Sequence, residues 1–460
     1  MNRIVIIGGG ISGLAAAHRV KELNQAAEVT VLEASERLGG TIQTEHRDGF
    51  LLERGPDSFI SEKPHAIALA KRLGLESQLI QTNEEYRRSF IVRDGRLRAV
   101  PEGFQLMAPS RMWPFITSDI FSIPGKVRMA ADLFLPRKST NGSTDESLAS
   151  FVRRRLGKEA LARMAQPMVG GIYTADPETL SLRATLPRFL DMEQKHRSLI
   201  LAMLRQGREQ KAGTSGARYS LFVSFERGMQ VLVDAVTRIR ADFFLNKRVQ
   251  RITYDQGWKI YTDKEEQFEA DAVCLAVPAY VAAALLTDTH ARLAEKLRKI
   301  KYASTATINF GYRRAAIKHP LNGFGFVVPF IEKRSLIACT FSNVKFSGRA
   351  PDGYVLLRAF AGGALQPEIF ALDEAEMAKR VEADLRELLG IREDPRFIEV
   401  AKWECSMPQY EVGHLDRVSE IEKLVSELPG LALAGNAYHG AGIPDCVRSG
   451  EKAAESMWNI

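Results

Sequence analysis

Cysteine is scarce in this chain, with four residues among 460 that stand far apart, at positions 274, 339, 405 and 446. None belongs to a CxxC or CxxH pair, which argues against a metal site and a disulfide framework and favours reduced thiols in the cytoplasm. Long apolar runs are missing too: no stretch of about 18 apolar residues is present, so no membrane-spanning helix is expected. The nearest approach, residues 270–286, is interrupted by Asp271 and Pro278 and predicts a buried strand followed by a helix.

The charge is only weakly biased, with a formal net charge of +7 and no block of lysine and arginine of the kind that binds nucleic acid. The densest basic cluster, Arg153-Arg154-Arg155, is predicted to be a solvated face of one helix. A modest basic excess favours an anionic small molecule or an acidic membrane surface, so no nucleic-acid partner is expected. Internal repeats are absent, which excludes repeat architectures, and the length is sufficient for two or three domains.

Glycines gather near the N-terminus, directly after the apolar run of residues 4–7. An alanine-rich segment follows them, so the pattern predicts a strand, a tight turn and a helix. Three of the glycines have Gly-x-Gly-x-x-Gly spacing, in which the first permits the turn, the second lets a pyrophosphate approach the backbone, and the third packs helix against strand. The helix N-terminus would then face the phosphates. The residues of this loop are Gly8, Gly9, Gly10, Ile11, Ser12 and Gly13.

An acidic residue stands at the distance that this motif requires. Leu32 and Glu33 end the next apolar run, and Glu33 lies 20 residues past Gly13, where a carboxylate can bind the ribose hydroxyls of an adenine dinucleotide. The strand, the helix and the acid together predict a site for FAD or NAD. The same stretch is short, apolar and preceded by Arg3, as in a signal peptide. It lacks a small-residue cleavage site, so we expect it to belong to the folded domain.

The order of the predicted elements favours an α/β class, α+β overall: a Rossmann-like FAD-binding domain with an interleaved mixed-sheet substrate domain and a helical subdomain. Asp94-Gly95, between alternating apolar and polar residues, predicts a hairpin. The polar, glycine-bearing residues 206–220 predict a flexible connection. The predicted domain boundaries are 1–85 with 221–300 and 401–460 for FAD binding, 86–103 with 301–400 for the substrate-binding sheet, and 104–205 for the helices.

Four further segments carry a resemblance to a known family. They are residues 53–59 (ERGPDSF), 193–200 (EQKHRSLI), 406–410 (SMPQY) and 442–446 (GIPDC). With the N-terminal glycines and the Ala-Gly-Asn of residues 434–436, they resemble the flavin amine oxidase superfamily. Within it they are most similar to the bacterial oxidases of protoporphyrinogen and coproporphyrinogen, specifically the Gram-positive type that acts on coproporphyrinogen III. The resemblance covers essentially the whole chain.

The resemblance implies that the cofactor is FAD. By position, the loop of residues 8–13 would hold the pyrophosphate, and Glu33, with Leu32 before it, the adenosine ribose. Thr41 lies beside a second glycine pair near the middle of the dinucleotide, where related flavin oxidases often have arginine. The remaining implied cofactor contacts are Gly55, Pro56, Asp57 and Ser58 along the flavin ring, Val249 at adenine, and Trp403, Ala441, Gly442 and Ile443 over the flavin from the C-terminal side.

Some of these residues have simpler explanations. Trp403 could be only a core aromatic, and Val249 would be apolar in any buried strand. Cys446 lies beside the implied flavin segment but is predicted to be structural, because no histidine or second cysteine accompanies it.

The implied reaction is the FAD-dependent, oxygen-using, six-electron oxidation of coproporphyrinogen III to coproporphyrin III in haem biosynthesis. Oxidation of protoporphyrinogen IX to protoporphyrin IX is also expected. Because the cofactor supplies the chemistry, no catalytic triad or carboxylate pair is required, and no residue is assigned to face the flavin N5. The alternatives are a protoporphyrinogen oxidase proper, another flavin amine oxidase or desaturase, and a flavoprotein that retains FAD without turnover.

Cations are the side chains expected to meet the substrate propionates. Lys63 matches a family position associated with a substrate carboxylate, and Arg87 and Arg197 are further candidates. A partly buried lysine–carboxylate pair at contact distance gains up to about 4 kcal/mol before desolvation. Alternatively, Lys63 is an exposed lysine at a helix start. Coproporphyrinogen has four carboxylates and protoporphyrinogen two, so a more basic pocket favours the former.

Residues 104–137 mix methionine, tryptophan, phenylalanine and isoleucine with lysine and arginine. One interpretation is the packed interior of a helical subdomain over the substrate cavity. The other is a peripheral docking surface at the inner face of the cytoplasmic membrane. In all, the expected partners of the protein are a porphyrinogen substrate, molecular oxygen, a membrane surface in peripheral contact, and a protein of the haem pathway.

Overall fold

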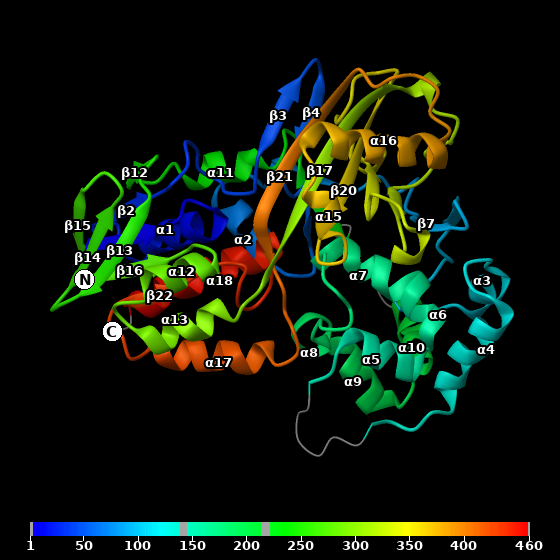
Figure 1. Cartoon of the computed structure of the whole chain (residues 1–460), viewed down its shortest axis with the longest axis horizontal. Helices are drawn as coiled ribbons and strands as arrows, with labels where there is room; N and C mark the ends of the chain where they lie inside the picture. Colours follow the sequence, from blue (N-terminus) through cyan, green and yellow to red (C-terminus); the bar gives the residue numbers. More distant parts are fainter. Residues whose placement is uncertain (1–2, 106, 139–144, 213–220, 459–460) are drawn as a thin grey trace.

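The computed structural model describes residues 3–105, 107–138, 145–212 and 221–458. Figure 1 shows three regions: a dinucleotide-binding region with both chain ends on the left, a large sheet at the upper right, and a helical region below it. The long strands β17 (Tyr302–Arg313) and β21 (Phe397–Pro408) run from the large sheet toward the dinucleotide-binding region.

The dinucleotide-binding region is built on a parallel sheet with the strand order β12-β2-β1-β16-β22. Alternate residues of the central strand pack on opposite faces. Ile4 and Ile6 contact the helix side, formed by α1 and α18, and Val5 and Ile7 contact an antiparallel meander with α12. The predicted Rossmann-like arrangement is confirmed. The elements are β1 (Arg3–Ile7), β2 (Glu28–Leu32), β12 (Asp242–Phe244), β16 (Ala272–Leu275), β22 (Leu431–Leu433), α1 (Ile11–Leu23), α18 (Ile443–Trp458), α12 (Ala279–Leu285) and the meander β13 (Val249–Tyr254), β14 (Trp258–Thr262) and β15 (Gln267–Ala270).

The second sheet is mixed and has the order β21-β17-β20-β19-β18-β7-β8. The predicted hairpin forms its edge, and Asp94 and Gly95 have φ angles of 50° and 70°, as a tight two-residue hairpin turn requires. Helix α16 (Glu374–Leu389) lies against this sheet, and its N-terminus is capped by the Asp373 side chain, which accepts from the Glu376 N–H. The other strands are β20 (Tyr354–Gly362), β19 (Ala338–Phe341), β18 (Gly325–Val327), β7 (Phe90–Arg93) and β8 (Arg96–Ala99).

Smaller elements join these regions. They are β3 (Thr44–Arg47) with β4 (Phe50–Glu53), β5 (Phe59–Ile60) with β11 (Phe222–Phe225) and β6 (Leu79–Gln81), β9 (Phe104–Gln105) with β10 (Ala108–Pro109), and the helices α2 (His65–Arg72), α11 (Gln230–Val236), α13 (Ala291–Arg298), α14 (Ser342–Lys345), α15 (Pro367–Phe370) and α17 (His414–Val425). None of the helices in the described part of the chain is long and apolar enough to cross a membrane.

The helical region has its own apolar core, to which Phe115, Phe121, Phe151 and Met203 contribute. Its helices are α3 (Met112–Thr117), α4 (Ile123–Ala130), the short 3-10 turn η2 (Ala131–Leu133), α5 (Leu148–Arg155), α6 (Lys158–Ala160), the π-helical turn η3 (Leu161–Ala165), α7 (Gln166–Tyr173), α8 (Leu182–Thr185), α9 (Pro187–His196) and α10 (Leu199–Ala212).

One prediction for this region was wrong. The three consecutive arginines are not a solvated face, because Arg155 is fully buried and pairs with the equally buried Asp132. The expected flexible connection over residues 206–220 begins as helix, since α10 continues to Ala212. The rest of that connection, residues 213–220, lies outside the described residues.

Candidate functional site

The first glycine loop has the geometry of a phosphate cradle. A Cβ added to Gly13 would lie 2.0 Å from the Gly8 carbonyl oxygen, so the loop closes only with glycine there. A Cβ on Gly10 would meet no atom closer than the Gly40 Cα, at 4.0 Å. Gly10 is also the N-cap of α1, and no side chain caps the first N–H groups of this helix. An open approach to uncapped N–H donors fits the pyrophosphate of FAD.

Glu33 is fixed by the same loop. Its Oε2 accepts from the Gly9 N–H at 2.7 Å, and its Oε1 accepts from the Ser35 N–H at 2.8 Å and the Ser35 hydroxyl at 2.7 Å. The preceding Leu32 is buried. Carboxylate oxygens have further acceptor capacity, so Glu33 could receive ribose hydroxyls in this orientation.

A second glycine pair completes the cradle and adds an arginine that sequence reasoning did not select. The Gly39 N–H donates to the Gly9 carbonyl at 2.8 Å, which joins the two loops. The Arg37 guanidinium donates to the carbonyls of Leu38 and Ile42 at 3.1 and 3.0 Å. Burial, with the nearby charge of Arg54, lowers the pKa of Arg37. Arg37 comes shortly before a glycine pair in the loop that follows Glu33. This position could have identified it from the sequence.

Thr41 contributes through its backbone. The Thr41 side chain is exposed. Its carbonyl oxygen is packed so closely against Gly55 that a Cβ added to Gly55 would lie only 1.6 Å from it. Gly55 is therefore required for the contact between the loop of residues 39–41 and the turn of residues 55–58. This contact brings the implied pyrophosphate and flavin segments together.

The second sheet holds the turn of residues 55–58 by its carbonyl groups. The Trp403 indole N–H, from β21, donates to the Arg54 carbonyl at 2.9 Å. The Arg358 guanidinium, from β20, donates to the Glu53 carbonyl at 3.1 Å and to the Gly55 carbonyl. Trp403 is thus more than a core aromatic, because it fixes the backbone of the implied flavin-lining segment.

Asp57 is the charged centre of this turn. The Lys345 ammonium lies 3.0 Å from its Oδ2, and Arg358 approaches its other oxygen at 3.9 Å. Burial opposes the ionised carboxylate, but these two cations outweigh burial and hold the pKa of Asp57 well below its usual range. The Ser58 hydroxyl donates to Asp57 at 2.8 Å. Lys345 and Arg358 were missed because they are far from this turn in sequence: 288 residues separate Lys345 from Asp57, and 303 separate Arg358 from Gly55.

Glu53 is a buried acid directly before the same turn. Its carboxylate accepts from the Met229 N–H at 2.7 Å and from the Thr44 hydroxyl at 2.8 Å. Burial is nevertheless the larger effect and raises the pKa of Glu53 to about 7. The side chain therefore changes its protonation state near neutral pH.

The raised pKa of Glu53 predicts that stability falls as the pH rises. Its stabilising contribution is complete below the unfolded-state pKa of about 4.5 and is lost as the pH increases through about 7. The loss should be on the order of 3 kcal/mol, since one pKa unit corresponds to about 1.4 kcal/mol. Glu53→Gln keeps the shape and cannot ionise, so its thermal midpoint should depend less on pH between 5 and 8, roughly the range in which Glu53 titrates. An unchanged pH profile relative to an exposed control, Glu84→Gln, would contradict the assignment.

Lys63 has a partner inside the chain. Its ammonium donates to Asp445 Oδ2 at 2.6 Å, and Asp445 is buried in the first turn of α18, two residues after Ile443. This ion pair gives Lys63 a structural role in holding the segment that the resemblance implies over the flavin. Binding of a substrate carboxylate by Lys63 stays a prediction.

The three predicted substrate cations lie in different parts of the fold. Lys63 precedes α2, Arg87 is exposed in the segment between β6 and β7, and Arg197 ends α9 in the helical region. Figure 1 shows α9 well away from α1 and α2. Val249 is buried in β13 and belongs to the same apolar cluster as Leu32, the residue before Glu33.

The chain is similar to known proteins over nearly its whole length. A family profile described as flavin-containing amine oxidoreductase matches residues 11–457. The chain is 36% identical to coproporphyrinogen III oxidase of Bacillus subtilis (strain 168) over 98% of this chain and 96% of the relative. It is 35% identical to coproporphyrinogen III oxidase of Propionibacterium freudenreichii over 99% and 90%. Chloroplastic protoporphyrinogen oxidase of Nicotiana tabacum is 31% identical over 98% and 85%.

Two solved structures illustrate the fold. One, from Exiguobacterium sp. 255-15 and described provisionally as a protoporphyrinogen oxidase, has a TM-score of 0.89 at 31% identity and covers 100% of this chain and 99% of that one. Cyclohexylamine oxidase from Brevibacterium oxydans has a TM-score of 0.70 at 17% identity and covers 100% and 99%. The latter likeness shows the fold alone.

Proposed function

Because the chain belongs to the flavin-containing amine oxidoreductase family, we propose that it uses FAD to oxidise coproporphyrinogen III to coproporphyrin III. The observation that carries the substrate assignment is the full-length similarity to relatives named for this reaction, at 36% and 35% identity. Protoporphyrinogen IX is a second substrate of the same proposed site, since a further relative is named for it. The reaction belongs to haem biosynthesis in the cytoplasm under this proposal.

The chain's own residues supply binding and positioning. FAD, when bound, accepts the hydrogen equivalents that leave the macrocycle, so the protein need not provide a nucleophile or an acid–base pair. The loop of residues 8–13 and Glu33 would hold the adenine dinucleotide portion. The turn of residues 55–58 would lie along the flavin, and Lys345 and Arg358 keep that turn in place through Asp57.

Each porphyrinogen loses six electrons and six hydrogens when it becomes a porphyrin. With molecular oxygen as the acceptor, three oxygen molecules become three hydrogen peroxide molecules, which balances the reaction. Parallel aerobic turnover of coproporphyrinogen III and protoporphyrinogen IX, followed by porphyrin fluorescence and peroxide release, tests the proposal. Faster oxidation of the former supports it. Preference for the latter would make this a protoporphyrinogen oxidase, and turnover of neither would favour an amine oxidase or desaturase activity.

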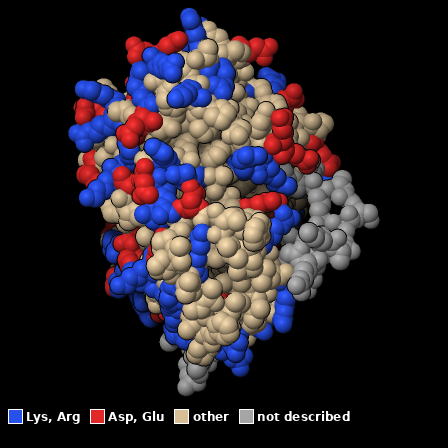
Figure 2. Space-filling view, turned by 90° about the vertical axis from the view of Figure 1, so that its right-hand side faces the viewer, with Lys and Arg blue, Asp and Glu red and all other residues tan. Residues whose placement is uncertain are grey.

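We also propose that one face of the helical region contacts a membrane peripherally. Trp113 and Ile116 on α3 and Ile123 and Val127 on α4 are each more than half exposed. Figure 2 shows a broad uncharged area in the lower part of the molecule, on the side where these helices lie, with lysine and arginine around it. Residues 104–137 therefore contribute both to a packed apolar core and to an exposed apolar surface. An apolar surface bordered by cations suits an anionic lipid interface. A haem-pathway protein partner stays a prediction.

Vesicle binding tests the membrane proposal. The double variant Trp113→Ser with Ile123→Ser should bind vesicles containing anionic lipid at least about tenfold more weakly, because each large apolar side chain contributes roughly 1.5–3 kcal/mol when buried. Phe330→Ser with Ile331→Ser, an exposed pair on another segment, is the matched control and should bind like the parent. Equal binding of all three proteins, or no binding by the parent, would contradict the proposal.

A further inference from the structure

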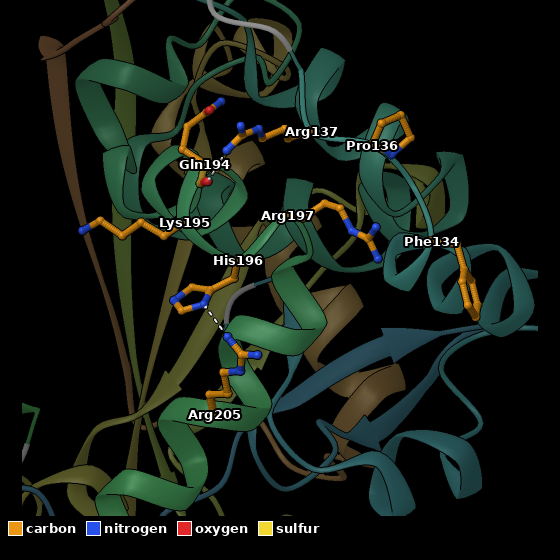
Figure 3. Close-up of a pocket in the computed structure, with 8 residues that line it drawn as sticks. All are labelled: Phe134, Pro136, Arg137, Gln194, Lys195, His196, Arg197 and Arg205. Atoms are coloured by element: carbon orange, nitrogen blue, oxygen red, sulfur yellow. Dashed lines mark hydrogen bonds between the residues drawn. The ribbon is translucent and has the colours of Figure 1, made fainter.

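A depression on the helical region is lined by cationic side chains, and none of its lining residues in the described part of the chain is acidic. It has a volume of about 480 Å³ and lies between the end of α9, the segment after η2, and α10 (Figure 3). Of the residues the structure describes, none forms an ion pair with the arginines or the lysine of this depression, and no carboxylate lines it. The charged lining residues are Arg137, Lys195, Arg197 and Arg205, and the ring of His196 lies among them.

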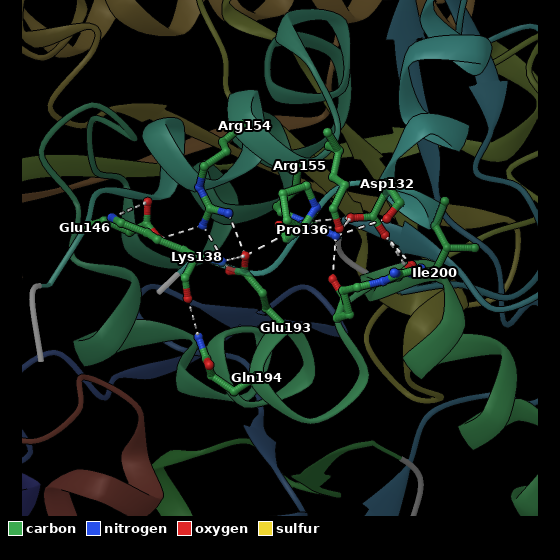
Figure 4. Close-up of polar contacts among 12 residues, drawn as sticks. Asp132, Pro136, Lys138, Glu146, Arg154, Arg155, Glu193, Gln194 and Ile200 are labelled. Carbon is green, nitrogen blue, oxygen red and sulfur yellow. Dashed lines mark hydrogen bonds and ion pairs between the residues drawn. The ribbon is translucent and has the colours of Figure 1, made fainter. Parts of the chain in front are cut away.

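The turn that carries Lys195 and Arg197 is held in a costly conformation. Arg197 has a φ of 64°, a backbone angle that residues other than glycine seldom adopt. The fully buried Arg155 donates to the Arg197 carbonyl at 2.6 Å. The fully buried Asp132 accepts from the Ser198 hydroxyl at 2.6 Å and from the Ile200 N–H at 3.1 Å (Figure 4). Such strain persists where surrounding contacts determine it, and it is concentrated at functional sites.

Two ion pairs beneath the turn, one fully buried and one partly buried, fix geometry more than they add stability. Arg155 pairs with Asp132, and Arg154 makes two hydrogen bonds to Glu193, at 2.6 and 2.9 Å. Well-packed apolar residues often stabilise a core as well as buried ion pairs do. The network here sets the direction of the segment from Lys195 to Arg197, and that segment faces the depression.

The aromatic side chain of Phe134 lines the depression together with the cations. Phe134 is 80% exposed at the edge of the depression, as Figure 3 shows, although a phenylalanine of this kind is normally buried. A flat aromatic surface beside several cations matches a ligand with a flat apolar body and several carboxylates. The volume is within the range of about 300–1,000 Å³ for small-molecule sites.

We propose that this depression is a surface site for a porphyrin tetracarboxylate, the product of the reaction proposed above, and this inference rests on that function. The oxidised macrocycle is flat and aromatic and can stack on Phe134, whereas the porphyrinogen is not flat. Its carboxylates would meet Arg137, Arg197 and Arg205. The site lies on α9 and α10, apart from the flavin cradle, and would hold the product after it leaves the reaction site.

Titration of the FAD-loaded protein with coproporphyrin III, followed by porphyrin fluorescence and equilibrium dialysis, tests the proposal. Arg137→Gln with Arg205→Gln should remove one bound porphyrin per chain or weaken it at least about tenfold, about 1.4 kcal/mol. Arg238→Gln with Arg240→Gln removes the same charge from an exposed segment far along the chain and should bind like the parent. Phe134→Ser should weaken porphyrin binding several-fold.

Competition identifies the ligand class. Mesoporphyrin IX, with two carboxylates, should bind more weakly than coproporphyrin III, and inorganic pyrophosphate should displace the porphyrin poorly. Full displacement by pyrophosphate with no effect of Phe134→Ser would overturn the proposal in favour of a general anion site. Equal porphyrin binding by the parent and the Arg137→Gln, Arg205→Gln variant would also overturn it. Porphyrinogen turnover measured on the same parent protein reports separately on the proposed function.

Discussion

A Gly10→Ala variant is expected to fold like the parent protein and to bind FAD at least about a hundredfold more weakly, a loss of about 2.7 kcal/mol. The reason is that the space next to Gly10 is open within the protein, with no atom nearer to an added Cβ than Gly40 Cα at 4.0 Å. The methyl group would therefore occupy room that only the cofactor needs. Flavin retained through purification and a fluorescence titration with FAD measure the effect.

The neighbouring glycines separate cofactor binding from folding. Gly13→Ala places a Cβ 2.0 Å from the Gly8 carbonyl oxygen, so it should disturb the fold of the loop itself. Gly257→Ala, where the nearest atom is 3.7 Å away, is a neutral control. Normal FAD affinity in a folded Gly10→Ala protein would show that the cradle does not hold the pyrophosphate.

The second large effect is expected from Arg155→Met, which should destabilise the helical region by about 3–5 kcal/mol. The variant leaves Asp132 fully buried without its cation, and the Arg197 carbonyl loses the donor at 2.6 Å. The double variant Arg155→Met with Asp132→Asn removes both charges and keeps an amide oxygen that can accept from Ser198 and Ile200, so it should recover much of the loss. Thermal unfolding with near-ultraviolet circular dichroism measures both.

The pattern across the two variants distinguishes a buried ion pair from a solvated one. If Arg155 were on a solvated face, the single variant would cost less than about 1 kcal/mol, as exposed pairs do. If the double variant were as unstable as the single one, the cost would come from lost packing by the arginine rather than from an unpaired Asp132.

Local patterns in the sequence were sufficient for the nucleotide-binding core. The Gly8–Gly13 loop, the acid at residue 33 and the Asp94-Gly95 hairpin depend on backbone geometry within a few residues, and the structure has them where the patterns predict. Strand β20 of the second sheet follows the same rule, because its apolar run is buried on both faces.

Contacts between distant residues could not be predicted in this way. Asp57 depends on Lys345 at the end of α14 and on Arg358 of β20, and Lys63 pairs with Asp445 at the far end of the chain. The Arg153-Arg154-Arg155 run was interpreted as solvated because charged residues are rarely buried. Arg155 is the exception because Asp132 and several carbonyl groups satisfy its guanidinium.

The most direct test of the proposed function is an anaerobic titration of the FAD-loaded protein with coproporphyrinogen III, following the visible absorbance of the flavin and the porphyrin fluorescence together. Six-electron oxidation with a two-electron acceptor predicts that one-third of an equivalent of porphyrinogen bleaches the flavin completely, with one porphyrin formed for every three flavins. Flavin that stays oxidised at any amount of coproporphyrinogen, in a protein that binds FAD tightly, would contradict the proposal.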